Sequence, residues 1–215
     1  MFTGIIEELG TVERVTRGRV SAVLAIRAET ILSDLKIGDS VAVNGVCLTA
    51  TSLTGHGFTA DVMHETLDRS SLAGLGPGSP VNLERAMAAN GRFGGHIVTG
   101  HIDGTGTICE VISDEIAIYY SIKAPEKIMH YIVEKGSVAV DGISLTIAET
   151  TQTTFMVSVI PHTAQCTVLA HKKAGDKVNL ENDCIGKYIE HFLNWKEEKI
   201  TESKITKEFL FSNGF

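Results

Sequence analysis

Apolar and polar residues alternate along most of this chain in short runs, and Gly, Asn, Asp or Ser separate one run from the next. Such a pattern is typical of half-buried β-strands joined by turns. In the first part of the chain it predicts strands at residues 2–6, 11–15, 20–27, 41–53, 57–67 and 80–87, with a turn at residues 7–10. The run at 41–53 contains Asn44-Gly45, a strong hairpin signal, so it predicts two strands joined by a tight turn.

The same pattern occurs a second time. The stretch SVAVNGVCLT at residues 40–49 returns as SVAVDGISLT at residues 137–146. Upstream, FTGIIEELGTV at residues 2–12 aligns with VTGHIDGTGTI at residues 98–108. A period of about 97 residues is too long for a solenoid repeat, so it indicates a duplicated domain.

The second copy predicts strands at residues 97–103, 105–112, 116–123, 137–150, 154–160 and 176–182, with Asp141-Gly142 as the hairpin turn. Short strands at this spacing are typical of a closed barrel or a sandwich. Six short strands in each copy would close into a small antiparallel barrel without exposed edges. The predicted fold class is all-β, with two homologous six-stranded antiparallel barrels in tandem and a C-terminal α-helix.

Helical patterns are confined to a few stretches. Short helical turns are predicted at residues 31–37 and 70–75, and a short helix after Pro125. A longer helix is predicted at residues 185–199, where an apolar stripe recurs at helical spacing through Ile185, Tyr188, Ile189, Phe192 and Leu193. The stripe is compatible, at equal weight, with packing on the chain's own barrel and with a subunit interface.

The end of the chain and the domain limits follow from this arrangement. Residues 205–215 predict a last helical turn that ends near Asn213-Gly214. The predicted domains are residues 1–96 for the first barrel, 97–184 for the second, and 185–215 for a helix and tail that serve oligomerisation.

Composition narrows the class of partner. The sequence has 215 residues and a formal net charge of −7, which argues against nucleic acid or an anionic membrane as the partner. The cysteines show no CxxC spacing and no signal-like segment opens the chain, so we expect reduced thiols and a cytoplasmic protein. No apolar run is long enough to span a membrane. No metal-ligand spacing and no dinucleotide-binding glycine motif is present, so we expect neither metal nor cofactor.

Positions where the two copies differ are the candidates for chemistry. The aligned pairs that stand out are Ile5 with His101, Cys47 with Ser144, Glu65 with His162, and Ala86 with Asp183. Taken alone, Cys47 is more often a small buried hydrophobe than a reactive thiol. An isolated His101 is more often a surface or capping residue, and Asp183 is compatible with a solvated carboxylate. These residues by themselves indicate a duplicated small barrel that binds two similar small molecules or one two-fold ligand.

A set of motifs in order along the chain carries the interpretation further. MFTGIIEELG, VNGVCLT, VNLERAM, GGHIVTGHIDGTG, KGSVAVDGISLT, IPHT and VNLENDCIGKYIEHF together resemble the riboflavin synthase (α-chain) family, and the resemblance covers essentially the whole chain. It implies a tandem pair of Greek-key lumazine-binding barrels. It also implies the dismutation of two 6,7-dimethyl-8-ribityllumazine molecules to riboflavin and 5-amino-6-ribitylaminouracil by a four-carbon transfer, with no cofactor.

The resemblance also implies site residues. For catalysis it implies Cys47, His101, Ser144, Asp183 and Phe2. For a first pocket it implies Gly4, Ile5, Ile6, Cys47, Leu48, Thr49, Asp61, Val62, Met63, His64, Glu65 and Thr66. For a second pocket it implies Gly100, His101, Ile102, Ser144, Leu145, Thr146, Ser158, Val159, Ile160, Pro161, His162 and Thr163, with Lys135 binding across a subunit interface.

The family picture further implies a homotrimer held by C-terminal helices, with each active site between barrels of neighbouring subunits. Lumazine synthase is an expected partner enzyme. The alternative function is that of a non-catalytic lumazine- or flavin-binding antenna protein of the same fold. The site motifs of both copies are intact here, and this favours the enzyme.

Overall fold

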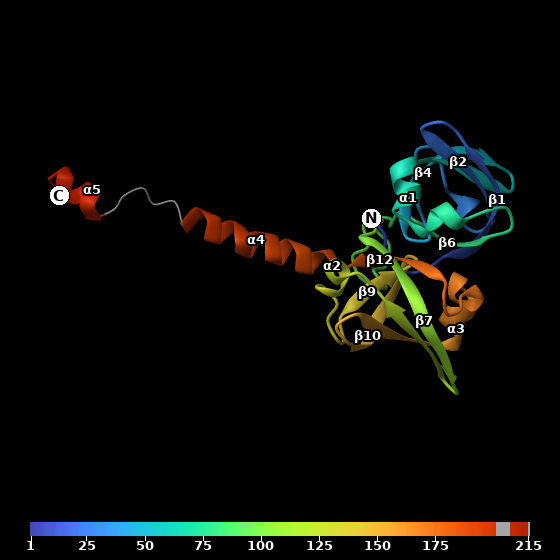
Figure 1. Ribbon diagram of the computed structural model, residues 1–215. Helices are drawn as coiled ribbons and strands as arrows, with labels where there is room; N and C mark the ends of the chain where they lie inside the picture. Colours follow the sequence, from blue (N-terminus) through green and yellow to red (C-terminus); the bar gives the residue numbers. More distant parts are fainter. Residues whose placement is uncertain (201–206, 215) are drawn as a thin grey trace. The chain divides into compact units, whose positions relative to one another are not determined.

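The computed structural model describes residues 1–200 and 207–214 of the chain. Six strands form a first closed antiparallel barrel in the ring order β1-β2-β5-β4-β3-β6 (Figure 1). Their bounds are β1 Glu8–Arg17, β2 Ser21–Arg27, β3 Ser40–Val43, β4 Val46–Thr54, β5 Gly57–Met63 and β6 Pro80–Arg85. In this ring β6 lies beside β3, the first of three hairpin-connected strands, which is the Greek-key arrangement.

The second repeat builds the same barrel. Its strands close in the order β7-β8-β11-β10-β9-β12, so each strand has the neighbours of its counterpart in the first repeat. The bounds are β7 Gly104–Asp114, β8 Ala117–Lys123, β9 Ser137–Val140, β10 Ile143–Thr150, β11 Thr154–Val159 and β12 Lys177–Asn182. The predicted fold of two six-stranded barrels is confirmed. The predicted domain limits stay predictions.

Each barrel encloses its own core, because alternate residues of every strand point inward. In the first barrel Leu24, Phe58 and Leu83 are fully enclosed, and in the second Ile122 and Phe155 take similar places. The outward residues of the same strands remain available to the surface and to ligands.

The first segment of each repeat was predicted wrongly. Residues 2–6 and 97–103 are not strands of their barrels, and β1 runs unbroken through part of the turn predicted at residues 7–10. These segments use their backbone groups elsewhere: Phe2 and Val98 pair with each other in an isolated antiparallel bridge, with N···O distances of 2.7 and 3.1 Å. The apolar alternation was real, but it serves contact between the repeats.

Short helices follow some strands. The predicted strand at 57–67 ends at Met63, where α1 (His64–Asp68) begins, and α3 (Pro161–Gln165) follows β11 in the same way. The predicted turns appear as η1 (Ile31–Ser33) and η2 (Ser71–Gly74), and the helix after Pro125 as α2 (Glu126–Met129). The remaining short helix is η3 (Val168–His171).

The repeats contact each other through equivalent residues. The Nδ2 of Asn82 donates to the carbonyl of Asp141 at 2.9 Å, and the Nδ2 of Asn179 donates to the carbonyl of Asn44 at 2.8 Å. The side-chain oxygen of Asn82 accepts from the amide of Val168 at 2.8 Å. Such reciprocity is what an approximate two-fold axis between the repeats requires.

The C-terminal part forms a separate unit. The chain divides into compact units Met1–Asp183, with both barrels, and Cys184–Phe215. The second unit contains α4 (Cys184–Ile200), which covers the predicted amphipathic helix, and α5 (Lys207–Ser212). Residues 205, 206 and 215 of the predicted tail lie outside the described residues. Among the described helices, none has the length and apolarity needed to cross a membrane.

Asn82 provides a test of the contact between repeats. Its side chain is fully buried, so replacing it by alanine leaves the Val168 amide and the Asp141 carbonyl buried without that partner. We expect Asn82→Ala to lower the free energy of unfolding by about 2–4 kcal/mol, measured by urea denaturation. The exposed Asn90 is the matched control, and Asn90→Ala should change stability by less than about 0.5 kcal/mol. Equal stability of the two variants would contradict the proposed weight of this contact.

Candidate functional site

The first segment of each repeat lies against the hairpin of the other repeat. The carbonyl of Gly4 accepts the amide of Ser144 at 2.8 Å, and the carbonyl of Gly100 accepts the amide of Cys47 at 2.9 Å. The predicted pockets group Gly4 with Cys47 and Gly100 with Ser144, and these groupings stay predictions. In the structure the N-terminal segment of each repeat is bonded to its own barrel and also contacts the hairpin of the other barrel.

Glycine is required at both of these contacts between a segment and the hairpin of the other repeat, which we call crossings. Gly4 has φ +77° and Gly100 has φ +82°, which few residues other than glycine adopt easily. A Cβ at Gly4 would lie 2.6 Å from the Cβ of Ser144, and a Cβ at Gly100 would lie 2.6 Å from the Cβ of Cys47. The backbone of each segment therefore touches the candidate catalytic residue of the other repeat directly.

Ser144 has an imidazole partner. Its hydroxyl lies 2.7 Å from the Nδ1 of His96, and His96 is itself buried. Burial lowers the pKa of His96 below its ordinary value of 6.5, while the nearby carboxylates of Asp183 and Glu181 act in the opposite direction. The ring is therefore neutral at pH 7 and able to accept a proton, the state a general base needs.

The sequence did not identify His96 as a functional residue, because it precedes the first aligned position of the second repeat and has no counterpart to differ from. One signal was present in the two glycines before it. A Cβ at Gly95 would lie 2.9 Å from the Cβ of Ser144, so this glycine brings the connector close to the hydroxyl.

Cys47 lies in different surroundings. Its half-buried side chain packs against a small apolar cluster of Phe2, Ala42, Val98 and Ala139. Phe2, which the resemblance placed at the site, is fully buried and forms part of this wall. The two equivalent positions thus differ in more than thiol and hydroxyl, since one has an imidazole beside it and the other has hydrocarbon.

The other predicted residues divide by the direction of their side chains. The core of the barrels contains the side chains of Leu48, Val62, Leu145 and Val159. The outer surface carries those of Thr49, Asp61, Met63, Glu65, Thr146, Ser158, Ile160, His162 and His101, with Ile5 half-exposed and Ile6, Ile102, His64, Thr66, Pro161 and Thr163 partly covered. Only backbone groups of the first set could contact a ligand outside the barrel.

Lys135 has an unusual backbone. It adopts φ +64°, and its repeat counterpart is Gly38 with φ +94°. Both amides make the equivalent bond, from Lys135 to the carbonyl of Ile147 at 2.9 Å and from Gly38 to that of Ala50 at 2.8 Å. The Nζ of Lys135 lies 3.8 Å from a carboxylate oxygen of Glu134 and 3.5 Å from the carbonyl of Ala148.

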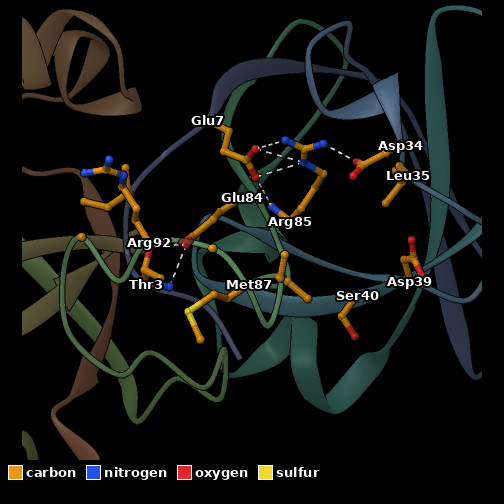
Figure 2. Close-up of a pocket in the computed structure, with 15 residues that line it drawn as sticks. Thr3, Glu7, Asp34, Leu35, Asp39, Ser40, Glu84, Arg85, Met87 and Arg92 are labelled. Carbon is orange, nitrogen blue, oxygen red and sulfur yellow. Dashed lines mark hydrogen bonds and ion pairs between the residues drawn. The ribbon is translucent and has the colours of Figure 1, made fainter.

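A cavity of about 510 Å³ opens beside the first repeat's N-terminal segment (Figure 2). Of the predicted site residues it includes only Ile5, but with Ala86 this gives the first-repeat counterparts of both His101 and Asp183. Figure 2 shows Arg85 joined to Glu7 and Asp34 at one side of the cavity and Glu84 bonded to Thr3 at another. The side chains of Arg85 and Glu84, which line this cavity, are thus already bonded to other residues.

Two buried carboxylates each bind the N-terminal segment of their own repeat. Glu84 accepts the amides of Thr3 and Gly4 at 2.7 and 3.0 Å. Glu181 accepts those of Thr99 and Gly100 at 2.6 and 3.0 Å. Among the described residues there is no group of three or more His, Cys, Asp or Glu side chains arranged to hold a metal ion.

Comparison with known proteins agrees with this architecture. The sequence pattern of the family described as Lumazine binding domain matches residues 3–86 and 99–183, once for each barrel. The solved structure of LumP complexed with riboflavin superposes with a TM-score of 0.79 at 23% sequence identity, covering 85% of this chain and 99% of that one. LumP complexed with 6,7-dimethyl-8-(1'-D-ribityl) lumazine gives a TM-score of 0.77 over the same shares. At this identity the likeness shows the fold alone.

Curated relatives are much closer in sequence. The chain is 55% identical to riboflavin synthase of Actinobacillus pleuropneumoniae and 51% identical to that of Bacillus subtilis, over 215 residues and the full length of both proteins in each case. Riboflavin synthase of Photobacterium phosphoreum is 42% identical over 100% of this chain and 99% of its own. With both repeats matched and the whole length aligned, the chain belongs to the riboflavin synthase family of enzymes, which the sequence motifs had indicated.

Proposed function

We propose that this enzyme converts two molecules of 6,7-dimethyl-8-ribityllumazine into riboflavin and 5-amino-6-ribitylaminouracil. The observation that supports this best is the pair of equivalent but chemically different positions, Ser144 with its imidazole and Cys47 with its apolar wall. Two identical substrates need two similar sites, and they must be treated differently, because one gives up four carbons and the other receives them. The repeat supplies the similarity and the substitutions supply the difference.

The Ser144 side is suited to proton transfer. The 7-methyl group of one lumazine must lose a proton, and the resulting carbanion is delocalised into the ring. A neutral His96 at 2.7 Å can accept the hydroxyl proton of Ser144 while the oxygen takes the proton from the methyl group. Asp183 and Glu181 stabilise the imidazolium that forms, because both carboxylates raise the pKa of His96. We assign His96 and Ser144 together as the base.

The Cys47 side is suited to holding the second lumazine. The apolar cluster behind Cys47 is itself buried, so the half-buried thiol is the group of this set that a flat ring could contact. A lumazine held here is the electrophile: the carbanion from the other site attacks its ring, and this molecule is then the one that gives up the four carbons. Bringing the two rings together supplies much of the rate by proximity.

The antenna function is not favoured. The LumP structures support only the fold, whereas full-length identity of 51–55% links the chain to riboflavin synthases. The hydrogen bond between Ser144 and His96 also provides a proton acceptor, which a protein that only binds a chromophore does not need.

We further propose a homotrimer formed through α4, with Lys135 reaching a substrate across the interface. The apolar stripe supports this, since its residues are each more than half exposed in the single chain: Ile185, Tyr188, Ile189, Phe192 and Leu193. Isolated exposed apolar residues are ordinary, but a continuous stripe on a helix usually marks an interface. Association with lumazine synthase and a cytoplasmic location stay predictions from the family resemblance.

Turnover tests the assigned base. With 6,7-dimethyl-8-ribityllumazine as sole substrate, under anaerobic and metal-free conditions, we expect riboflavin absorbance to appear. Ser144→Ala and His96→Ala should each lower kcat by about 100-fold and leave the Kd for lumazine nearly unchanged, because a base acts mainly in the transition state. Turnover should fall only below pH 6.5, where the imidazole becomes protonated, since burial lowers the pKa of His96.

Asp183→Asn is the matched control for this pH dependence. Removing the Asp183 charge should lower the pKa of His96 further and move the acid limb to lower pH, because that carboxylate raises the pKa. Binding of lumazine without any riboflavin formation by the unaltered protein would instead support the antenna function. An unchanged kcat in His96→Ala would remove His96 from the mechanism.

Lys135 and Gly38 form a second test. Replacing Lys135 by glycine relieves a left-handed backbone, so we expect the free energy of unfolding to rise by up to about 1 kcal/mol while the KM for lumazine increases. The reciprocal change Gly38→Lys should lower stability by a similar amount. Thermal unfolding and steady-state kinetics on both variants measure this. A Lys135→Gly variant with unaltered kinetics would show that the side chain does not reach the substrate.

Assembly through α4 is tested by truncation. A chain ending at Ile185 keeps both barrels but loses nearly all of the stripe, so we expect monomers that fold, bind lumazine and have no turnover. In the full chain, Phe192→Glu should have the same effect, while Asn194→Glu places the same charge off the stripe and should leave the assembly intact. Light scattering and activity are the readouts. A fully active monomer would place both substrates within one chain.

A further inference from the structure

We infer that the buried carboxylates of Glu84 and Glu181 are positioning residues that act across the repeats. Glu84, in the first barrel, fixes the geometry at Ser144 of the second barrel, and Glu181, in the second barrel, fixes the geometry at Cys47 of the first. The inference deepens the proposed function, because it rests on Ser144 and Cys47 being the two site positions.

The Glu84 carboxylate holds one short segment by several bonds. One oxygen accepts the amide of Thr3 at 2.7 Å and its hydroxyl at 2.8 Å, and the other accepts the amide of Gly4 at 3.0 Å. Glu84 is 4% exposed and is placed by β6, a strand with the barrel on both sides. Buried hydrogen bonds to a charged group are stronger than neutral ones, so residues 3 and 4 are fixed to the first barrel.

Glu181 repeats this arrangement on β12. It accepts the amide of Thr99 at 2.6 Å and its hydroxyl at 2.8 Å, and the amide of Gly100 at 3.0 Å. The agreement of all three distances with those of Glu84, within 0.1 Å, shows that the two copies keep one device. The device is retained in both repeats, while the residues that it serves have diverged.

The contact with the other repeat is made by the carbonyl of the same glycine whose amide binds the carboxylate. The amide of Gly4 faces Glu84, and its carbonyl accepts the amide of Ser144 in the other barrel. The amide of Gly100 faces Glu181, and its carbonyl accepts the amide of Cys47. A single peptide residue therefore connects each carboxylate to the opposite site, and a Cβ added at either glycine would lie 2.6 Å from the Cβ of Ser144 or Cys47.

A glutamine cannot replace either carboxylate fully. A carboxylate only accepts hydrogen bonds, whereas an amide side chain has one oxygen and one nitrogen that donates. In Glu84→Gln or Glu181→Gln the oxygen can face the threonine or the glycine amide, but the nitrogen then meets the remaining N–H. We expect the N-terminal segment to become less firmly held in each variant. The weakened contact should then be seen at Ser144 for Glu84→Gln and at Cys47 for Glu181→Gln.

Two readouts that do not depend on turnover test the crossing. We expect Glu181→Gln to raise the alkylation rate of Cys47 by iodoacetamide about tenfold, and Glu84→Gln to leave it unchanged. Conversely, Glu84→Gln should raise the hydrogen-exchange rate of the Ser144 amide about tenfold and leave that of the Cys47 amide unchanged. Peptide mapping by mass spectrometry separates the thiols, and the exposed Cys109 and Cys166 serve as internal controls.

Four rates together decide the inference: Cys47 alkylation in each of the two variants, and exchange of the Ser144 and Cys47 amides in Glu84→Gln. An effect in the same barrel as the substitution, or equal effects on both sites, would overturn it, since either would show general loosening. If a glutamine variant does not fold, Thr3→Val and Thr99→Val remove only one donor from each carboxylate and must show the same crossing. Because neither readout needs substrate, a protein that lacks the proposed activity would still give the crossed pattern.

Discussion

The structure depends on two glycine carbonyls that reach from one barrel's segment to the other barrel's hairpin. Gly4 binds the amide of Ser144 and Gly100 binds that of Cys47, at 2.8 and 2.9 Å. Each contact combines a glycine in a left-handed conformation, which has no Cβ to clash with Ser144 or Cys47, and a buried carboxylate that accepts the amide of that glycine. Neither barrel therefore has its candidate site from its own residues alone. Each of the two candidate positions is in contact with a residue of the other repeat.

The contact between the repeats is nearly symmetric, and a few of its residues differ between the two copies. The asymmetric chemistry rests on those few residues. The hairpin turn is Asn44 in one repeat and Asp141 in the other, both at φ 45°. Burial raises the pKa of Asp141, while Lys172, whose Nζ lies 3.3 Å away, opposes that rise. Ser144 and Cys47 differ in their partners as well as in their own atoms. The backbone contacts between the repeats are alike, whereas the side chains at the two contact points, Cys47 and Ser144, differ.

The sequence allowed the fold to be predicted where local signals were strong. Hairpin turns at Asn44-Gly45 and Asp141-Gly142 and the long repeat were enough for two six-stranded barrels. Residues 2–6 have the apolar alternation of a strand. That alternation is the same whether the pairing partner lies in the same repeat or in the other one. The crossing was not predictable, since two segments with the same sequence pattern fit either hairpin equally well. His96 was missed because it lies just outside the aligned repeat.

Fusion of the two copies in one chain explains why the two crossings can have different chemical surroundings. Two separate identical barrels making these contacts would present the same residue at both crossings, so both sites would hold either a thiol or a hydroxyl. In one chain the crossings can evolve separately, and the connector that joins the copies becomes usable. His96 belongs to that connector, and Gly95 brings it against Ser144. The imidazole can serve only one of the two crossings, because a chain with two repeats has one connector. The covalent join therefore adds to the inequality that the substitution of Cys47 by Ser144 already gives.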